Sequence, residues 1–296
     1  MKCRCPYVIC PLHGNCNACI AKNIQTHDLC YCMEETAIQR GAKMPQRMPE
    51  QVFLEDSFED MSRKSAELIA EVVRRKPDAL VSLPAGSTVK RTYEILHEMA
   101  ERHEVDFTRT EFVALDEWLD LEDESENCDA FMRKNFYGPL NIPDERVKRF
   151  DIHASDLERT CRDVDAFIFA HHGIDVMLLG VGMNGHLGLN EPNSDFSEYS
   201  RVVDLDPVTM QVGQKYFTGS MKLTRGITLG VRHMFDAGQV ILQVGGSHKA
   251  EIVEKIFRTP PTELLPATVL MLVPHGVIVT DREAAARVLD ILEPKQ

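Results

Sequence analysis

The chain has 296 residues, of which 44% are hydrophobic and 27% are charged, and its formal net charge is −13. This length suffices for one large domain plus a small appendage. The negative charge argues against nucleic acid and anionic membrane surfaces as partners, and no apolar run approaches the ~20 residues that a membrane-spanning helix needs. We therefore expect a cytoplasmic protein that binds neither nucleic acid nor membrane.

Residues 1–35 are predicted to form a separate module, because seven of the nine cysteines of the chain fall there. So short a segment contains too few apolar residues to fold unaided. In the cytoplasm, clustered thiols bind metal more often than they form disulfides. The predicted group is a structural zinc ion with four ligands: Cys10, Cys16, Cys19 and Cys32. The alternative ligands are Cys5, Cys30 and His13, and an iron–sulfur cluster is the alternative group.

Residues 36–52 are predicted to be a linker, because they are mostly polar and contain two prolines. The main domain is then predicted over residues 53–296. Ser57 and Asp60 have the spacing of an N-terminal capping box and predict a helix there. Its apolar face would include Met61, Leu68, Ile69 and Val72. A docking or regulatory role, or a purely structural one, fits the cysteine-rich module that precedes this domain.

Strands and helices are predicted to alternate along the main domain. Short apolar runs predict buried strands at 79–84, 111–115, 174–180, 239–244 and 277–280. Further segments predict helices near 129–137, 155–171, 207–217 and 247–257, and a last helix that ends at 292. This alternation predicts a Rossmann-like α/β fold with a doubly wound, largely parallel sheet. The segments that follow the strands should share one edge of the sheet, where such folds place their ligands.

The first of these segments is a glycine turn with two hydroxyls, Gly86-Ser87-Thr88, ahead of a helix that contains Lys90. The unpaired amides and the dipole at a helix N-terminus attract anions, so this turn is a candidate anion site. The spacing of a P-loop is absent. An ordinary helix cap is the alternative interpretation.

The second segment, 115–118, carries acidic residues directly after a predicted strand. Asp116 lies at the strand end, where its position is held, whereas the acidic residues that continue to Glu126 are expected to face water. An aspartate with an ordinary pKa of ~3.9 is a weak base, and partial burial would raise this pKa. A solvated acidic loop is the alternative.

The third segment, 180–196, is a glycine-rich loop that follows the strand at 174–180. Asn184, His186 and Glu191 are polar residues placed just after a buried strand, and they combine an imidazole with a carboxylate. Such a pair suits proton transfer near neutral pH. A tight turn with an incidental histidine is the alternative.

The same loop contains a G-x-G-x-x-G pattern from Gly180 to Gly185, with Asp204 near the distance of a ribose-binding acid. This pattern also allows a dinucleotide site. Such a site needs a helix after its third glycine, however, and the glycine and proline that follow up to Pro192 oppose a helix. The dinucleotide interpretation is therefore disfavoured.

The last segment, 245–250, places Lys249 in the first turn of a predicted helix. A cation is poorly placed there against the helix dipole, which favours a role for Lys249 in binding a ligand.

The stretch GVGMNGHLGLNEP (180–192) resembles the signature of glucosamine-6-phosphate deaminases, in a family that also contains 6-phosphogluconolactonases. Asp116-Glu117-Trp118 resembles the deaminases' D-E-Y segment, and 245–250 resembles their G-x-x-K-A turn. The resemblance covers roughly residues 50–292. Lactonases carry a segment similar to GHTASLFP where this chain has GHLGLNEP, and this difference favours a deaminase.

The resemblance implies an enzyme that converts a 2-amino-2-deoxyhexose 6-phosphate into a ketose 6-phosphate and ammonia. Asp116 would move the C2 proton, and His186, oriented by Glu191, would assist ring opening. The implied substrate-binding residues are Gly86, Ser87, Thr88, Gly182, Lys215 and Lys249. Proton transfer and iminium hydrolysis need no catalytic cofactor. A homo-oligomer is expected.

The chain departs from the family pattern at three places. Asn184 stands where the deaminases usually have aspartate; its amide oxygen can accept the imidazole N–H but cannot stabilise an imidazolium by charge. Lys215 stands where they usually have a phosphate-binding arginine, so the bidentate fork is lost. Residues 270–274 differ from their L-Q-x-H-P segment. The epimer of the substrate stays open, and a non-catalytic sugar-phosphate sensor and a lactonase stay as alternatives.

Overall fold

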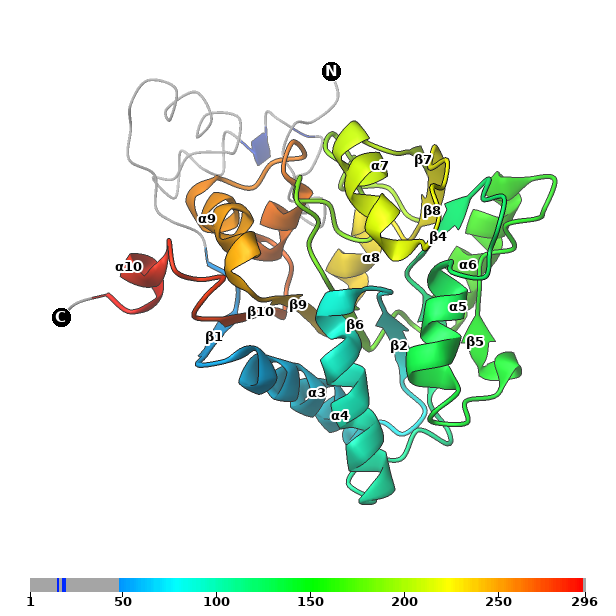
Figure 1. Ribbon diagram of the computed structural model, residues 1–296, viewed down its shortest axis with the longest axis horizontal. Helices are drawn as coiled ribbons and strands as arrows, with labels where there is room; N and C mark the ends of the chain where they lie inside the picture. The colour runs from blue at the N-terminus through cyan, green and yellow to red at the C-terminus, as the bar shows by residue number, and fades with distance from the viewer. Residues whose placement is uncertain (1–14, 16–17, 20–47, 295–296) are drawn as a thin grey trace.

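The computed structural model describes residues 15, 18–19 and 48–294, and a seven-stranded sheet forms its centre (Figure 1). All neighbouring strands are parallel, in the order β1-β10-β9-β6-β2-β3-β5. The α/β fold with a largely parallel sheet is confirmed. The strands are β1 (Gln51–Glu55), β2 (Leu80–Leu83), β3 (Glu111–Ala114), β5 (Val147–Lys148), β6 (Val176–Leu179), β9 (Val240–Val244) and β10 (Gly276–Asp281).

Helices flank both faces of this sheet, as a doubly wound fold requires. The helices are α3 (Phe58–Arg75), α4 (Lys90–Glu101), α5 (Cys128–Met132), α6 (Leu157–Ala170), α7 (Pro207–Gly213), α8 (Val231–Asp236), α9 (Ala250–Arg258) and α10 (Leu289–Leu292). Side chains of α3 and α4 share one hydrophobic core with one face of the sheet, and those of α6, α8 and α9 share a second core with the other face. The predicted cap of α3 is confirmed, because the Ser57 side chain accepts a hydrogen bond from the Asp60 amide.

Side chains along β6 alternate between these two cores. Val176 and Leu178 pack on the side of α3, and Met177 and Leu179 pack on the side of α6. All four are fully buried. A strand that is buried on both faces must be apolar throughout, which explains why the strongest strands of this domain are continuous hydrophobic runs in the sequence.

A second sheet, of three antiparallel strands, is absent from the sequence prediction. Its order is β4-β8-β7, and the strands are β4 (Asp116–Leu119), β7 (Arg201–Asp204) and β8 (Arg225–Thr228). The interpretation of Asp116 to Trp118 as a loop is therefore wrong, because these residues form β4 and both Glu117 and Trp118 are buried. Leu115 alone separates β3 from β4, so Asp116 begins the second sheet one residue after a strand of the first sheet ends.

The edge strand β1 is absent from the sequence prediction, which places the first strand at 79–84. β1 includes Gln51 and Val52, the last two residues of the segment predicted as a linker, and it pairs in parallel with β10 at the edge of the sheet. An edge strand has one neighbour and is only half-buried, so its apolar pattern is weak. Residues 36–47 lie outside the described part of the chain.

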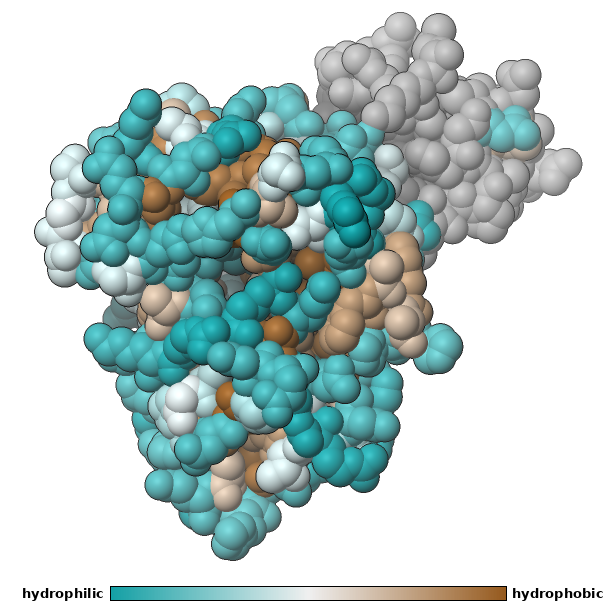
Figure 2. Space-filling view, turned by 90° about the vertical axis from the view of Figure 1, so that its right-hand side faces the viewer, coloured by the Kyte–Doolittle hydropathy of each residue, from teal (hydrophilic) through white to brown (hydrophobic). Residues whose placement is uncertain are grey.

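The surface matches the acidic, polar composition. Hydrophilic residues predominate on the face shown in Figure 2, and apolar side chains gather there only in small patches. Among the described residues, no helix combines the length and the apolar character that crossing a membrane requires.

Candidate active site

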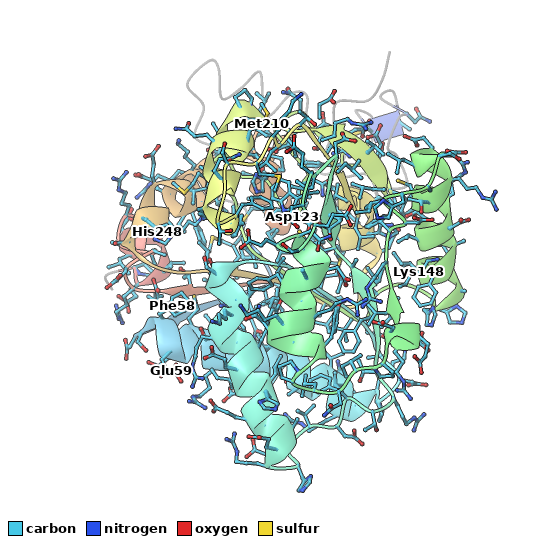
Figure 3. All side chains as sticks on the ribbon, turned by 45° about the vertical axis from the view of Figure 1, so that its right-hand side comes forward. Phe58, Glu59, Asp123, Lys148, Met210 and His248 are labelled. Atoms are coloured by element: carbon cyan, nitrogen blue, oxygen red, sulfur yellow. The ribbon has the colours of Figure 1, made fainter. Side chains whose placement is uncertain are left out.

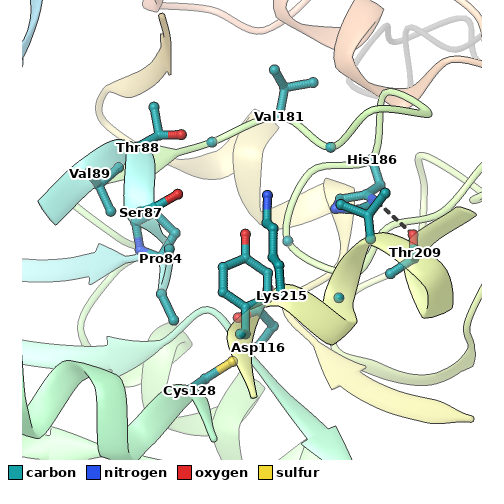
Figure 4. A pocket seen from close by; sticks show the side chains of 18 of the residues that line it. Pro84, Ser87, Thr88, Val89, Asp116, Cys128, Val181, His186, Thr209 and Lys215 are labelled. Carbon is teal, nitrogen blue, oxygen red and sulfur yellow. Dashed lines mark hydrogen bonds between the residues drawn. The ribbon is translucent and has the colours of Figure 1, made fainter. Parts of the chain in front are cut away.

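The carboxyl ends of β2, β3, β6 and β9 meet at one edge of the sheet, and a cavity of about 250 Å³ lies among the segments that follow them (Figure 4). The strand order reverses here, because β3 lies on one side of β2 and β6 on the other. The two connections therefore diverge and leave a crevice, as in other open α/β sheets. Phe58 and His248 lie at the exposed rim (Figure 3). The predicted site residues that line the cavity are Gly86, Ser87, Thr88, Asp116, Gly182, His186, Lys215 and Lys249.

The glycine-rich segment after β6 is an irregular loop, and the next helix begins only at Pro207. The dinucleotide interpretation therefore lacks the helix that it requires. Gly182 lies flat against the imidazole of His186, because a Cβ there would be 2.3 Å from Cε1 of the ring. Gly182 thus allows the backbone to approach the histidine, in addition to lining the cavity.

His186 is held through Nδ1. This atom lies 3.0 Å from Oγ1 of Thr209, as the dashed line in Figure 4 shows, and 3.3 Å from Oε2 of Glu191. Thr209 and Glu191 are both buried. A carboxylate at Nδ1 favours the tautomer that carries its proton there, and Nε2 has no hydrogen-bond partner among the described residues. The arrangement leaves Nε2 available to exchange a proton with a ligand in the cavity.

Asn184 supports Glu191 and not the imidazole ring. Its Nδ2 donates to Oε2 of Glu191 at 2.8 Å and to Oγ1 of Thr209 at 3.4 Å. Its amide oxygen, expected from the sequence to accept the imidazole N–H, instead accepts the backbone N–H of His186 at 3.2 Å. The place next to Nδ1 is taken by Thr209 and Glu191, which is why that expectation is wrong.

Glu191 is held in its ionised form. Burial by itself would raise the pKa of Glu191, but hydrogen bonds from His186, Thr209 and Asn184 bring the pKa below its ordinary value. The backbone N–H of Asp206 adds a donor 3.3 Å from Oε1. An ionised carboxylate beside Nδ1 can stabilise positive charge on the imidazole when Nε2 takes up a proton.

Asp116 faces the same cavity from the start of β4. The loop that carries His186 passes directly over it, because a Cβ at Gly188 would lie 3.4 Å from Oδ2 of Asp116. Burial, with the neighbouring Glu117 carboxylate, raises the pKa of Asp116 to about 7. A carboxyl group that titrates near neutral pH suits general base catalysis.

Glu117 is fixed by three backbone donors. Its carboxylate accepts the N–H groups of Trp118, Cys128 and Asp129 at 2.8, 2.9 and 2.8 Å. Burial nevertheless raises the pKa of Glu117. Because its oxygens are already used within the protein, Glu117 acts on the site through its charge next to Asp116 and not by contact with a ligand.

Two lysines give the cavity a cationic part. Nζ of Lys249 is buried and donates to the carbonyl oxygen of Val181 at 2.7 Å; burial and the nearby Lys215 lower the pKa of Lys249 to about 8. Nζ of Lys215 lies 5.0 Å from the ring centre of Tyr216 and makes no ion pair with a described residue. Two close cations in a cavity favour an anionic ligand.

The turn Gly86-Ser87-Thr88 lines the cavity together with these lysines. Gly86 has φ of +152°, which other residues rarely adopt, and it leads into the helical turn Ser87–Val89 and then α4. The helical turn Ser87–Val89, which precedes α4, thus adjoins the cavity with its backbone amides, as a phosphate site requires.

Three residues of the site have no clear signal in the sequence: Thr209, Cys128 and Tyr216. Thr209 contacts His186 across 23 residues of chain, so only the packing of α7 against the loop reveals it. The thiol of Cys128 lies beside the Asp116 carboxyl group, and burial, with the nearby Glu117, raises the pKa of Cys128 well above its ordinary value. Cys128 is one of only two cysteines outside the N-terminal segment, which is the one hint that the sequence contains.

The predicted zinc ligands cannot be compared with the structure as a set. Cys10, Cys16 and Cys32 lie outside the described residues, and Cys19 alone is described, as half-buried. Among residues 15, 18–19 and 48–294, no three metal-binding side chains gather in one place. The zinc site therefore stays a prediction.

Comparison with known proteins identifies relatives over most of the chain. The chain is 34% identical over 241 residues to a glucosamine-6-phosphate deaminase of Thermoanaerobacter pseudethanolicus, covering 81% of this chain and 95% of that protein. It is 36% identical over 225 residues to a glucosamine-6-phosphate deaminase of Lachnoclostridium phytofermentans, covering 75% and 95%.

Solved structures give the same relationship. The fold matches a monomeric glucosamine-6-phosphate deaminase with a TM-score of 0.76 and 29% identity, over 80% of this chain and 99% of that one. It also matches a 6-phosphogluconolactonase from Trypanosoma cruzi with a TM-score of 0.67 and 21% identity, over 83% and 99% of the two chains. The second likeness concerns the fold alone. The family model of glucosamine-6-phosphate isomerases/6-phosphogluconolactonase matches residues 54–278, and the chain belongs to this family.

Proposed function

We propose that this protein is a deaminase that converts an amino-sugar 6-phosphate into a ketose 6-phosphate and ammonia. The observation that carries the proposal is the meeting of two proton-transfer groups at one cavity: Asp116, with a pKa of about 7, and the His186–Glu191 pair. Relatives that are named glucosamine-6-phosphate deaminases, at 34–36% identity, support the same reaction.

The phosphate binds at the cationic part of the cavity. The amides of the Gly86-Ser87-Thr88 turn and the ammonium groups of Lys215 and Lys249 supply donors and charge there. A dianion next to Lys249 favours the charged form of this lysine and offsets its burial. Lysine at position 215 provides charge without a bidentate fork, so the phosphate is held by several single contacts.

Ring opening moves a proton between the ring oxygen and the anomeric hydroxyl of the sugar. His186 takes or gives this proton at Nε2, the nitrogen that has no partner among the described residues. Glu191 and Thr209 hold the ring by Nδ1, and Asn184 holds Glu191. Three residues around one imidazole thus keep it in the orientation that proton transfer requires.

The open-chain aldehyde is then isomerised by Asp116. Its carboxylate takes the proton from C2 as the double bond forms between C1 and C2, and the aldehyde oxygen takes up the proton that the C2 ammonium group releases. Asp116 then returns a proton to C1. The nitrogen at C2 becomes an iminium, water adds to it, and ammonia leaves, which yields the ketone at C2. Every step is a proton transfer or a hydrolysis, so the chain's own residues can supply the chemistry.

Incubation with glucosamine 6-phosphate and galactosamine 6-phosphate, with ammonia measured, tests the proposal and identifies the epimer. Release of ammonia from either sugar supports a deaminase. Binding of both sugars without release would favour the alternative of a non-catalytic sensor, for which the replacement of aspartate by Asn184 is the argument. Hydrolysis of 6-phosphogluconolactone would place the chain with the lactonases of the family.

The cell compartment, the oligomeric state and the zinc module are the subjects of separate proposals. We infer a cytoplasmic enzyme that forms a homo-oligomer, and light scattering of the purified protein decides the second point. We also propose that residues 1–35 form a zinc module held by Cys10, Cys16, Cys19 and Cys32, because clustered thiols stay reduced in the cytoplasm and bind zinc. Elemental analysis tests this module, and folded protein without zinc would refute it.

A further inference from the structure

A second cavity, of about 190 Å³, lies behind Asp116. We call it the rear cavity and the cavity of the proposed active site the front cavity. The two cavities share four lining residues: Ala85, Asp116, Asn127 and Cys128. These residues therefore form the partition between the cavities. The reaction described above gives no role to the rear cavity.

The Asp116 carboxyl group is part of this partition. Its Oδ2 lies on the front side, because it is close to Gly188, which lines only the front cavity. The same residue also lines the rear cavity, as does its neighbour Cys128. Figure 4 shows Asp116 and Cys128 together at this end of the front cavity. One carboxyl group is thus within reach of ligands on both sides.

The rear cavity reaches the surface of the protein. Glu124 and His153 line it, their side chains are 40% and 72% exposed, and they lie 3.3 Å apart at its mouth. Water fits there: the volume is several times the ~30 Å³ that one molecule occupies in the liquid, and the lining offers carboxylate and amide groups.

The other charged groups of the rear cavity already have partners within the protein. Glu117 accepts three backbone N–H groups, and Asp129 is paired with Arg149 at 2.5 Å and with Arg133 at 2.6 Å. A charged metabolite would have to displace these pairs to bind. Water molecules can occupy the cavity without displacing these pairs, which favours water as the occupant.

We propose that the rear cavity is a water route to Asp116, through which the proton taken from C2 exchanges with solvent while the sugar phosphate fills the front cavity. The C2–H bond breaks and its proton passes to a carboxyl oxygen of Asp116. That proton exchanges with water of the rear cavity, and the carboxyl group then delivers a solvent-derived proton to C1. This inference rests on the proposed deaminase reaction and adds a path that the reaction does not itself require.

The first test is the reaction in heavy water, with the deuterium at C1 of the ketose 6-phosphate measured by mass spectrometry at low conversion. The wild-type product is expected to carry deuterium there. Ile152→Phe adds bulk at a half-buried residue that lines only the rear cavity, so its product is expected to lose most of this deuterium while ammonia release continues. Leu157→Phe is the matched control, because this half-buried residue lines neither cavity and its product should resemble that of the wild type.

Two results would overturn the water route. A wild-type product without deuterium at C1 would show that the proton on Asp116 is sealed from solvent. Equal deuterium in the products of the wild type and Ile152→Phe would show that exchange occurs through the front mouth. If Ile152→Phe fails to fold, Ala114→Leu offers a second plug in the same cavity.

A second measurement needs no turnover. Cys128 borders both cavities. When fructose 6-phosphate fills the front cavity, methyl methanethiosulfonate can reach Cys128 only through the rear cavity. Peptide mass spectrometry then measures the rate of labelling. Labelling is expected to be several-fold slower in Ile152→Phe, and equal rates would contradict the route. Absence of ammonia release in every assay would refute the deaminase instead, and the labelling would still decide whether the rear cavity admits small molecules.

Discussion

Oγ1 of Thr209 lies 3.0 Å from Nδ1 of His186, which ties the imidazole in the loop after β6 to the helix α7. Glu191 contacts the same nitrogen at 3.3 Å, so the ring is fixed from two directions. The orientation of the proton-transfer group therefore depends on the hydroxyl of a buried residue as well as on a carboxylate.

Removal of this hydroxyl tests its contribution. Thr209→Val keeps the shape of the side chain but removes the hydroxyl, and with it also the 3.4 Å contact from Nδ2 of Asn184. The loss of the hydrogen bond to the imidazole, worth ~1–1.5 kcal/mol, predicts a kcat about tenfold lower with little change in KM. Steady-state kinetics of ammonia release measures both constants. Thr209→Ser, which restores the hydroxyl, should recover most of the activity. A fully active valine variant would show that Glu191 alone orients the ring.

The pH dependence of kcat/KM should be bell-shaped. Asp116 acts as a base only when ionised, so activity rises as the pH passes about 7, where its raised pKa lies. Lys249 binds phosphate only when protonated, so activity falls as the pH passes about 8, its lowered pKa. An arginine stays charged at higher pH, so Lys249→Arg should shift the descending limb of the profile to higher pH. A flat profile across the neutral range would contradict both assignments.

The raised pKa of Asp116 also predicts a cost in stability. The folded state disfavours the ionised carboxyl, so the free energy of unfolding decreases as the pH rises from the ordinary pKa of 3.8 to about 7. Above that pH the cost is up to about 4 kcal/mol, and Asp116→Asn avoids it. This inactive variant should melt at a higher temperature than the wild type at alkaline pH and lose that advantage in acid.

Thermal unfolding at several pH values checks this expectation. Glu122→Gln is the matched control, because Glu122 is an exposed acidic residue of the same region and its neutralisation should leave the melting temperature nearly unchanged. An Asp116→Asn variant that is less stable than the wild type at every pH would show that the carboxylate has unrecognised stabilising contacts.

Asn184→Asp restores the residue that the deaminases usually have, but here it should destabilise the protein. The amide nitrogen of Asn184 donates to Glu191 at 2.8 Å, and a carboxylate in its place would face another carboxylate. The expected loss is ~1–3 kcal/mol when both groups are ionised, and it should diminish in acid. Melting curves at acidic and alkaline pH measure this; Asn184→Ala, which adds no charge, should show a loss with little dependence on pH.

The parallel sheet could be predicted from the sequence because its inner strands are buried on both faces. Val176 to Leu179 form an uninterrupted apolar run, and the glycines that follow interrupt regular structure at the strand end. The antiparallel sheet could not be predicted in the same way. β4 and β7 are four residues long and mix charged and apolar side chains, so they match neither a buried strand nor a clear alternation.

Some residues of the candidate site could likewise be predicted from the sequence, and others could not. Asp116 could be identified because it lies two residues after the end of β3, and His186 because it lies in the glycine-rich loop that follows β6. The fold places its ligands at these strand ends. Thr209 could not, because its role arises from the packing of α7 against a loop 23 residues away. Asn184 was identified, but its partner was not, since the choice between the imidazole and Glu191 depends on side-chain geometry that a linear pattern does not contain.

Leu115, the single residue between β3 and β4, imposes a fixed length on the chain at this point. Its carbonyl oxygen accepts the N–H of Leu229, so even this one connecting residue is tied to a neighbouring segment. Because successive residues of a strand point to opposite sides, inserting or deleting one amino acid here would turn the Asp116 side chain away from the substrate. The number of residues at this junction therefore determines whether the Asp116 carboxyl group faces the cavity.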